Sequence, residues 1–188
     1  MCGILGAVGE FNKETFQKAV DLISHRGPDD SGVFFQENLG LGHRRLSIQD
    51  VSQAAHQPMT TEDGRFTIVF NGEIYNHLEI RHKLNTSHVF HSSGDTETLL
   101  YAWAEKGKDI LPVLNGIFSF AIWDRHQKMV TLVRDPFGVK PLYYYFDDHK
   151  LLFGSELKSI NAFPIDTTID HKALLDYLRF LYAPFERT

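Results

Sequence analysis

The chain has 188 residues, of which 43% are hydrophobic and 23% are charged. This composition is ordinary for a globular protein and excludes collagen-like, disordered and coiled-coil proteins, while the length favours one substantial domain with a single core. The formal net charge of -5 and the absence of a Lys/Arg-dense run argue against a nucleic-acid groove or an anionic-membrane surface. We therefore expect a small molecule or another protein as partner, and neither nucleic acid nor membrane.

The chain contains a single cysteine, Cys2. One cysteine excludes an intramolecular disulfide framework and a multi-cysteine zinc site. No run reaches the ~18 consecutive apolar residues of a membrane span, and the N-terminal residues lack the basic region and cleavage site of a signal peptide. We therefore expect a cytoplasmic protein. Removal of Met1 would make Cys2 the N-terminal residue, with a thiol and a free amine on one α-carbon.

The first part of the chain predicts a strand, a helix and a loop in succession. The apolar run over residues 2–8 predicts a buried strand that starts at the terminus. Apolar residues at helical spacing behind Asn12 predict a helix over residues 13–24. The segment 25–32 is rich in Gly, Pro, Asp and Ser and predicts a loop.

The rest of the chain alternates between strand clusters and helices. Segments rich in aromatic and β-branched residues predict strands over residues 33–36, 39–46, 66–71, 117–123, 129–133 and 142–146. Helices are predicted over residues 76–84, from Asp95 or Thr96 onward, and from Asp170 to about Leu181. Without a steady βαβ alternation, this order favours a layered α+β fold. The apolar C-terminal segment resembles a chain cut within an element, so we expect a fragment.

Cys2 has two interpretations from its chemistry. As the N-terminal residue, its own α-amine, with an ordinary pKa of about 7.7 to 8.0, would suit proton transfer to and from its thiol. The alternative is a small buried apolar side chain, which is the commoner use of a free cysteine. Composition alone favours the second interpretation.

Six motifs reverse that preference. They are Cys2–Ile4, His25–Asp29, Arg45–Ile48, Asn71–Asn76, Gly94–Glu97 and Arg134–Tyr143. In this order they resemble the glutaminase domain of asparagine synthetases, which are class II glutamine amidotransferases within the N-terminal-nucleophile hydrolases. The resemblance implies a four-layer αββα sandwich of two antiparallel sheets flanked by helices. It further implies that residues 1–188 form this domain, truncated at its C-terminal end and without the synthetase domain.

The resemblance also implies a catalytic mechanism. Cys2 would attack the side-chain amide of glutamine to give a thioester and ammonia, with its α-amine taking and returning the proton. The side-chain amide of Asn71 and the backbone N–H of Gly72 would bind the oxyanion. Taken alone, Asn71-Gly72 favours a hairpin turn, because Asn-Gly is the strongest type I′ signal.

Further residues are implied to bind the free amino acid. Arg45 would pair the α-carboxylate of glutamine and Asp95 the α-ammonium, with Ile48 and Glu73 as additional substrate-binding residues. A helix N-cap is the alternative use of Asp95, and both uses can coexist. Arg26 and Asp29 are expected to organise the loop beside Cys2. Arg44 is expected to be a solvated surface charge.

The implied function is hydrolysis of L-glutamine to glutamate and ammonia for a synthetase domain that follows in cis. That domain would use ATP and magnesium, and aspartate is the leading acceptor. One alternative is the amidase half of a relative that amidates a sugar or another carboxylate; another is a catalytically silent domain that binds glutamine or docks on a partner. The ten histidines show no pattern typical of a metal site, no cofactor is expected in this segment, and a homodimer is left open.

Overall fold

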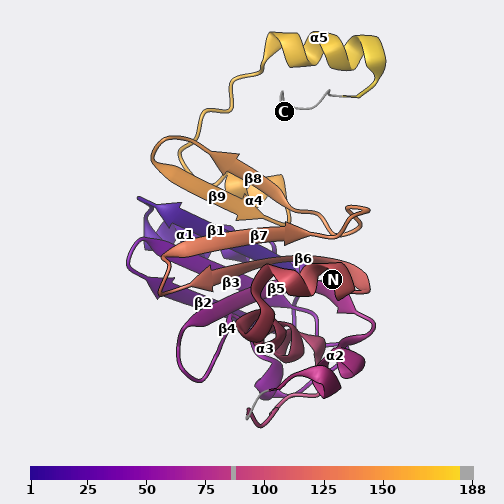
Figure 1. The fold of residues 1–188 in the computed structure, drawn as a ribbon. Coiled ribbons are helices and arrows are strands. Elements are labelled where there is room, and N and C mark those ends of the chain that lie inside the picture. The colour runs from indigo at the N-terminus through magenta and orange to yellow at the C-terminus, as the bar shows by residue number, and fades with distance from the viewer. Residues whose placement is uncertain (86–87, 183–188) are drawn as a thin grey trace.

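The strands form two antiparallel sheets in the computed structural model, which describes residues 1–85 and 88–182 (Figure 1). One sheet has the order β2-β3-β1-β9-β8 and the other β4-β5-β6-β7. The strands are β1 (Gly3–Gly9), β2 (Asp30–Gln36), β3 (Leu39–Arg45), β4 (Met59–Thr60), β5 (Phe66–Ile74), β6 (Gly116–Asp124), β7 (Met129–Arg134), β8 (Tyr143–Phe146) and β9 (Lys150–Gly154).

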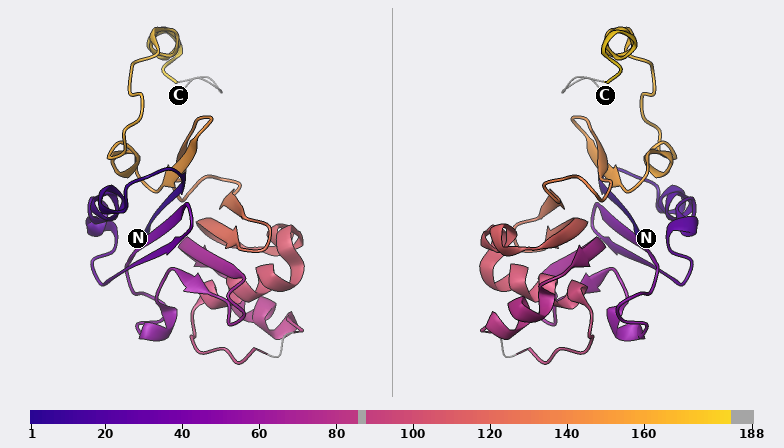
Figure 2. Two further views of the ribbon diagram at one scale, coloured as in Figure 1. Left: turned by 90° about the vertical axis from the view of Figure 1, so that its left-hand side faces the viewer. Right: turned by 90° about the vertical axis from the view of Figure 1, so that its right-hand side faces the viewer.

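Helices cover the outer faces of the two sheets. The α-helices are α1 (Lys13–Asp21), α2 (His77–Lys83), α3 (Asp95–Lys106), α4 (Leu157–Ile160) and α5 (His171–Phe180), and the 3-10 helices are η1 (Ser24–Arg26), η2 (Gln53–Ala55) and η3 (Gly107–Val113). Seen edge-on in Figure 2, α1 lies on one side of the sheets and α2 and α3 on the other. This arrangement confirms the predicted αββα sandwich.

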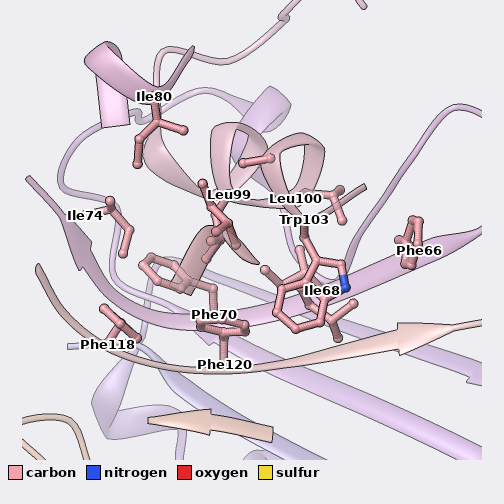
Figure 3. Packing of buried hydrophobic residues seen from close by; sticks show 13 residues of the cluster. Phe66, Ile68, Phe70, Ile74, Ile80, Leu99, Leu100, Trp103, Phe118 and Phe120 are labelled. Carbon is pink, nitrogen blue, oxygen red and sulfur yellow. The ribbon is translucent and has the colours of Figure 1, made fainter. Parts of the chain in front are cut away.

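Three clusters of buried apolar side chains hold the layers together. One lies between the four-stranded sheet and α3, where Leu99, Leu100 and Trp103 pack on strand residues such as Phe70 and Phe120 (Figure 3). A second joins α1 and α4 to the five-stranded sheet, and a third fills the space between the two sheets. Because every layer buries apolar surface against the next, the hydrophobic effect fixes the order of the layers.

The predicted helices follow their capping signals. The Asn12 side chain accepts a hydrogen bond from the Thr15 N–H at 3.0 Å and starts α1, and Asp170 caps α5 in the same way through Lys172 and Ala173. α1 ends earlier than predicted, at Asp21, and η1 follows at Ser24–Arg26. α5 lies apart from the sheets (Figures 1 and 2), and none of its residues is buried.

Asn71-Gly72 does not form the hairpin turn that the dipeptide favours when taken alone. Both residues lie inside β5, where Asn71 pairs with Ser119 and Gly72 with Phe118 of β6. A Cβ atom on residue 72 would lie 2.4 Å from the Ile117 carbonyl oxygen. Glycine is therefore required by the close approach of the two strands, and the long pairing with β6 overrides the local turn preference.

Other elements depart from the sequence prediction. β2 begins at Asp30, inside the segment predicted as a loop, and the short elements β4, β9 and α4 were not predicted. The apolar C-terminal residues interpreted as a cut element partly lie outside the described residues, since the description ends at residue 182. Among the described helices, none combines the length and apolarity that a membrane crossing requires.

Candidate active site

One pocket gathers the predicted site residues from separate parts of the chain. It is bordered by the start of β1, the loop after β3, the second half of β5 and the start of α3. All residues predicted to act in catalysis or substrate binding line it, namely Cys2, Arg45, Ile48, Asn71, Gly72, Glu73 and Asp95. The sandwich therefore brings together side chains that are up to 93 positions apart, from Cys2 to Asp95.

Cys2 lies immediately before β1, which is the central strand of its sheet. Its thiol donates a long hydrogen bond to the Leu46 carbonyl at 3.7 Å. Burial raises the pKa of the Cys2 thiol, so the thiol stays protonated at neutral pH and needs a base to become a nucleophile. In this chain Met1 is attached to the Cys2 nitrogen and also lines the pocket, where its sulfur lies 3.3 Å from Lys140 Nζ.

Asn71 presents an unpaired amide to the pocket. The residue is only 1% exposed, and neither its side-chain oxygen nor its nitrogen has a hydrogen-bond partner within the described part of the chain. A buried amide without partners costs about 1 to 3 kcal/mol. Such a group is expected where a ligand supplies the missing partner.

The Gly72 N–H is aimed at the same pocket by the alternation of β5. The flanking Phe70 and Ile74 N–H groups point away from β6, because they donate to Gln57 Oε1 at 2.7 Å and Asp95 Oδ2 at 2.8 Å. Alternate residues of a strand share an orientation, so the Gly72 N–H points to the same edge. β4 pairs only with Thr67 and Ile68, so it leaves this edge of β5 open to the pocket at Gly72.

Both main-chain polar groups of Phe70, the residue before Asn71, form hydrogen bonds with side chains. Besides the bond from its N–H to Gln57, its carbonyl accepts a hydrogen bond from His43 Nε2 at 3.0 Å. Burial lowers the pKa of His43 to about 4, so its ring is neutral. These contacts fix the β5 main chain at the point where Asn71 and Gly72 enter the pocket.

Arg45 is the last residue of β3 and is 6% exposed. Its guanidinium donates to the Ser52 carbonyl at 2.9 Å and to the Asp50 carbonyl. The planar group carries more N–H donors than these contacts use. Arg45 therefore lies fixed beneath the loop after β3 and keeps donors for a carboxylate in the pocket.

Asp95 is the first residue of α3, and the N-cap is Gly94 rather than Asp95. The Asp95 carboxylate instead accepts the Ile74 N–H and so ties α3 to β5. Burial raises the pKa of Asp95 to about 6, and the charge of nearby Glu73 adds to the rise. Glu73 itself accepts a hydrogen bond from Gln49 Nε2 at 3.0 Å. Two carboxylates that line one pocket suit a cationic group.

Ile48 lies on the exposed rim of the pocket, with 73% of its surface accessible. The loop that carries it is organised by Asp50, a residue that the sequence analysis did not single out. The Asp50 carboxylate accepts the Ser52 N–H at 2.8 Å and the Ser93 N–H at 2.7 Å. Hydrogen bonds from these serines lower the pKa of Asp50 to about 2. Asp followed two residues later by Ser is a local turn signal that was available in the sequence.

The two residues expected to organise the loop beside Cys2 lie outside the pocket lining. Arg26 donates to the Cys2 carbonyl at 2.9 Å. Asp29 accepts the Ser47 N–H at 2.8 Å, and its own N–H donates to the Arg45 carbonyl at 3.0 Å. Both residues therefore contact segments that carry site residues.

Arg44 is not the solvated surface charge that was expected. Its side chain is 18% exposed, pairs with Asp21 of α1 and donates to the Val20 carbonyl at 3.4 Å. Alternation along β3 explains the difference, because Arg44 faces α1 while its neighbours His43 and Arg45 face the other way. Arg44 thus joins a helix to the sheet.

The pocket combines a thiol, the hydrogen-bond donors of Asn71 and Gly72, a guanidinium and two carboxylates. This set can bind a zwitterionic amino acid and stabilise negative charge on a carbonyl oxygen beside the thiol. Lys140 also lines the pocket and was not singled out from the sequence. Over residues 1–85 and 88–182, no group of three or more His, Cys, Asp or Glu side chains is arranged to hold a metal ion.

Comparison with protein families gives a match over the whole chain. A family model described as "Glutamine amidotransferase domain" matches residues 1–188. Asparagine synthetase [glutamine-hydrolyzing] 1 of Bacillus subtilis (strain 168) is 40% identical over 195 residues, which cover 98% of this chain and 30% of that protein. Asparagine synthetase [glutamine-hydrolyzing] 3 of the same organism is 40% identical over 184 residues, covering 93% of this chain and again 30% of the relative.

Among solved structures, the fold is similar to glutamine phosphoribosylpyrophosphate amidotransferase from B. subtilis in complex with ADP and GMP. The TM-score is 0.71 at 19% identity, over 86% of this chain and 43% of the other. At that level of identity the likeness concerns the fold alone. The chain spans about 30% of the length of the two curated relatives described above.

Proposed function

Because this chain belongs to the glutamine amidotransferase domain family, we propose that its pocket hydrolyses L-glutamine to glutamate and ammonia with Cys2 as the nucleophile. The observation that carries the proposal is the unpaired, buried amide of Asn71 in the same pocket as the Cys2 thiol. A protein tolerates such a group where it serves a reacting ligand.

The reaction begins with the thiol. Once Met1 is removed, the Cys2 α-amine accepts the thiol proton while sulfur forms a bond to the side-chain carbonyl carbon of glutamine. The raised pKa of the thiol makes this base necessary. The same amine then protonates the leaving nitrogen, which departs as ammonia, and the acyl group remains as a thioester. Water, deprotonated by the amine, attacks the thioester and releases glutamate and the thiol.

The oxyanion of each tetrahedral intermediate forms beside β5. Asn71 Nδ2 and the Gly72 N–H supply two hydrogen-bond donors from a fixed strand. The Asn71 amide has no partner among the described residues, and the alternation of β5 turns the Gly72 N–H away from β6. Neither donor therefore needs to leave a partner within the sheet when charge develops on the oxygen. The geometry therefore favours the transition state over the ground state.

The ends of free glutamine are held by opposite charges. Arg45 pairs the α-carboxylate, and Asp95 with Glu73 pairs the α-ammonium. Arg45 is the last residue of β3, whereas Glu73 lies near the end of β5 and Asp95 at the start of α3. A glutamine side chain within a protein lacks both free groups, so the pocket selects the free amino acid.

The ammonia has a further use in the complete protein. The two curated relatives are named glutamine-hydrolysing asparagine synthetases, which supports aspartate as acceptor and asparagine as product. A synthetase segment in cis, with ATP and magnesium, would carry out that amidation. A silent glutamine-binding domain is less favoured because the pocket retains the full set of reactive groups. Another acceptor is less favoured because both relatives are named asparagine synthetases.

The test uses protein whose chain begins at Cys2. Replacing Cys2 by Ala is expected to abolish ammonia release from glutamine while leaving the circular dichroism spectrum unchanged, because a small half-buried side chain is lost. The glutamine analogue diazo-oxonorleucine is expected to alkylate the unmodified protein once, at Cys2, as mapped by mass spectrometry. Equal ammonia release by the two proteins would reject the proposed function.

A further inference from the structure

The main chain of Cys2 is held by a side chain and not by strand pairing. The pairing of β1 with β3 begins at Gly3, and the pairing with β9 begins at Leu5. Cys2 precedes both ladders, and its carbonyl accepts a hydrogen bond from Arg26 Nε at 2.9 Å. This bond sets the orientation of the peptide unit that links Cys2 to β1.

Arg26 is in turn held by Glu156, a residue that the sequence analysis did not single out. Glu156 Oε1 lies 3.1 Å from Arg26 Nη1 and 2.9 Å from His25 Nε2, and its other oxygen lies 3.2 Å from Lys158 Nζ. Arg26 and Glu156 are 130 positions apart. The contact therefore exists only because β9 returns the chain to the side of β1.

Ser155, the residue before Glu156, forms two hydrogen bonds with β1. The Ser155 N–H donates to the Ile4 carbonyl at 3.0 Å, and the Ile4 N–H donates to Ser155 Oγ at 3.0 Å. Ser155 is 1% exposed. These bonds hold residues 155–156 at a fixed place beside the nucleophile, so the Glu156 side chain starts from a rigid main chain.

The Glu156 carboxylate compensates the positive charge of the nearly buried Arg26 guanidinium. The Arg26 side chain is 9% exposed and that of Glu156 is 25% exposed. Partial burial alone would raise the pKa of Glu156, but hydrogen bonds from His25, Arg26 and Lys158 outweigh it and lower the pKa to about 2. The carboxylate is thus ionised at neutral pH. Without it, a nearly buried guanidinium would lie beside Cys2 with its charge uncompensated.

We propose that Glu156 is a positioning residue for the nucleophile, which acts by holding Arg26 against the Cys2 carbonyl. The inference rests on the proposed function, in which Cys2 supplies both the thiol and the amine. Both groups project from one α-carbon, so their direction depends on the peptide unit that Arg26 fixes. A displacement of about 1 Å in a reacting group can lower a rate by on the order of 100-fold.

The variant Glu156→Gln tests this role against the matched control Lys158→Ala. Lys158 contacts the carboxylate oxygen of Glu156 that Arg26 does not contact, so its loss perturbs the same cluster without releasing the guanidinium. We expect Glu156→Gln to lower kcat for glutamine hydrolysis about 10- to 100-fold with KM nearly unchanged. Lys158→Ala should stay close to the unmodified protein. Equal kcat values for Glu156→Gln and the unmodified protein would overturn the proposal.

A double-mutant cycle shows whether Glu156 acts through Arg26. If it does, Arg26→Gln combined with Glu156→Gln is expected to be no slower than Arg26→Gln alone. Independent, multiplying losses would instead indicate a general structural effect and would contradict the role. Should Glu156→Gln fail to fold, Glu156→Asp repeats the comparison with the charge kept and its reach shortened.

A measurement without glutamine separates this proposal from the proposed function. Because Cys2 is the only cysteine, its alkylation by iodoacetamide reports on the thiol alone. We expect Glu156→Gln to slow alkylation, since the amine is no longer placed to take the thiol proton, and Lys158→Ala to leave the rate unchanged. If the unmodified protein released no ammonia, the proposed function would fail, while equal alkylation rates would reject the role of Glu156.

Discussion

Asn71 is the residue at which function and stability oppose each other most clearly. Its amide is buried without partners, so it weakens the fold and is free to bind an oxyanion. Replacing Asn71 by Ala is expected to lower kcat by on the order of 100- to 1000-fold, the loss typical of one oxyanion donor. The melting temperature should not fall, because an unsatisfied amide is removed. Steady-state kinetics and thermal unfolding check both parts; a nearly unchanged kcat would contradict the role.

Asp95 is expected to make glutamine binding depend on pH, because it is proposed to pair the α-ammonium group. Its pKa is raised to about 6, so below that pH the carboxyl is neutral and no longer pairs an ammonium group. We expect calorimetry on the Cys2→Ala protein to show that glutamine binding tightens as the pH rises through about 6. In an added Asp95→Asn change, binding should be weak and lack this inflection. A pH-independent affinity from pH 5 to pH 7 would place the ammonium elsewhere.

The same shift has the opposite effect on the free energy of unfolding. Because the folded-state pKa of Asp95 lies above the ordinary value of 3.8, the folded state binds the proton more tightly than the unfolded state. This contribution to stability is present at low pH and is lost as the pH rises from about 4 to about 6. Asp95→Asn should therefore raise the free energy of unfolding at pH 7 by on the order of 1 to 3 kcal/mol.

At the scale of elements, the loop after β3 acts as a support for Arg45. Asp50 holds this loop through Ser52 and Ser93, and carbonyls of the loop hold the guanidinium. We expect Asp50→Ala to raise KM for glutamine about 10-fold, the effect of losing roughly one hydrogen bond to a charged group, with a smaller change in kcat.

A suitable control is Asp63→Ala. Asp63 organises a similar turn, accepting from Thr61 Oγ1 at 2.6 Å and from the Arg65 N–H at 3.0 Å, but it does not line the pocket. Its loss should leave KM unchanged. An equal rise in KM for both variants would mean that the effect is general destabilisation and would contradict the supporting role of Asp50.

Elements with strong local signals could be predicted from the sequence. α1 and α5 carry capping residues and apolar spacing that any isolated segment would show. β9 could not be predicted as readily, because its five residues become a strand only through pairing with β1 and β8. Asn71-Gly72 shows the opposite case, in which a strong local turn signal is overridden by pairing with β6.

The site shows the same division. Motif resemblance identified Cys2, Arg45, Asn71 and Asp95, and the structure brings them into one pocket. The resemblance did not identify His43, Gln57 and Glu156, because their contacts join distant segments. His43 and Gln57 form hydrogen bonds with Phe70, Gln57 also with Thr96, and Glu156 with Arg26. Such contacts leave no local pattern in the sequence, because the two partners come together only in the tertiary structure.

At the scale of the whole molecule, the sandwich holds the start of the chain at its centre. β1 lies between β3 and β9 in the five-stranded sheet, whereas N-terminal residues are commonly mobile. This position places Cys2 at the start of a central strand and in one pocket with Asn71 and Gly72 of β5 in the other sheet. The proposed mechanism therefore requires Cys2 to be the N-terminal residue, with its α-amine free to serve as the base.

The most direct measurement compares two preparations that differ only in Met1. One is processed to Cys2, and the other keeps Met1 because aminopeptidase is blocked, with intact mass confirming each. The attached Met1 converts the amine to an amide, which is no base at neutral pH, and places a side chain in the pocket. We predict rapid ammonia release from glutamine by the processed protein and almost none by the Met1 form, although both fold. Comparable activity in the two preparations would contradict the claim that the Cys2 α-amine is the base.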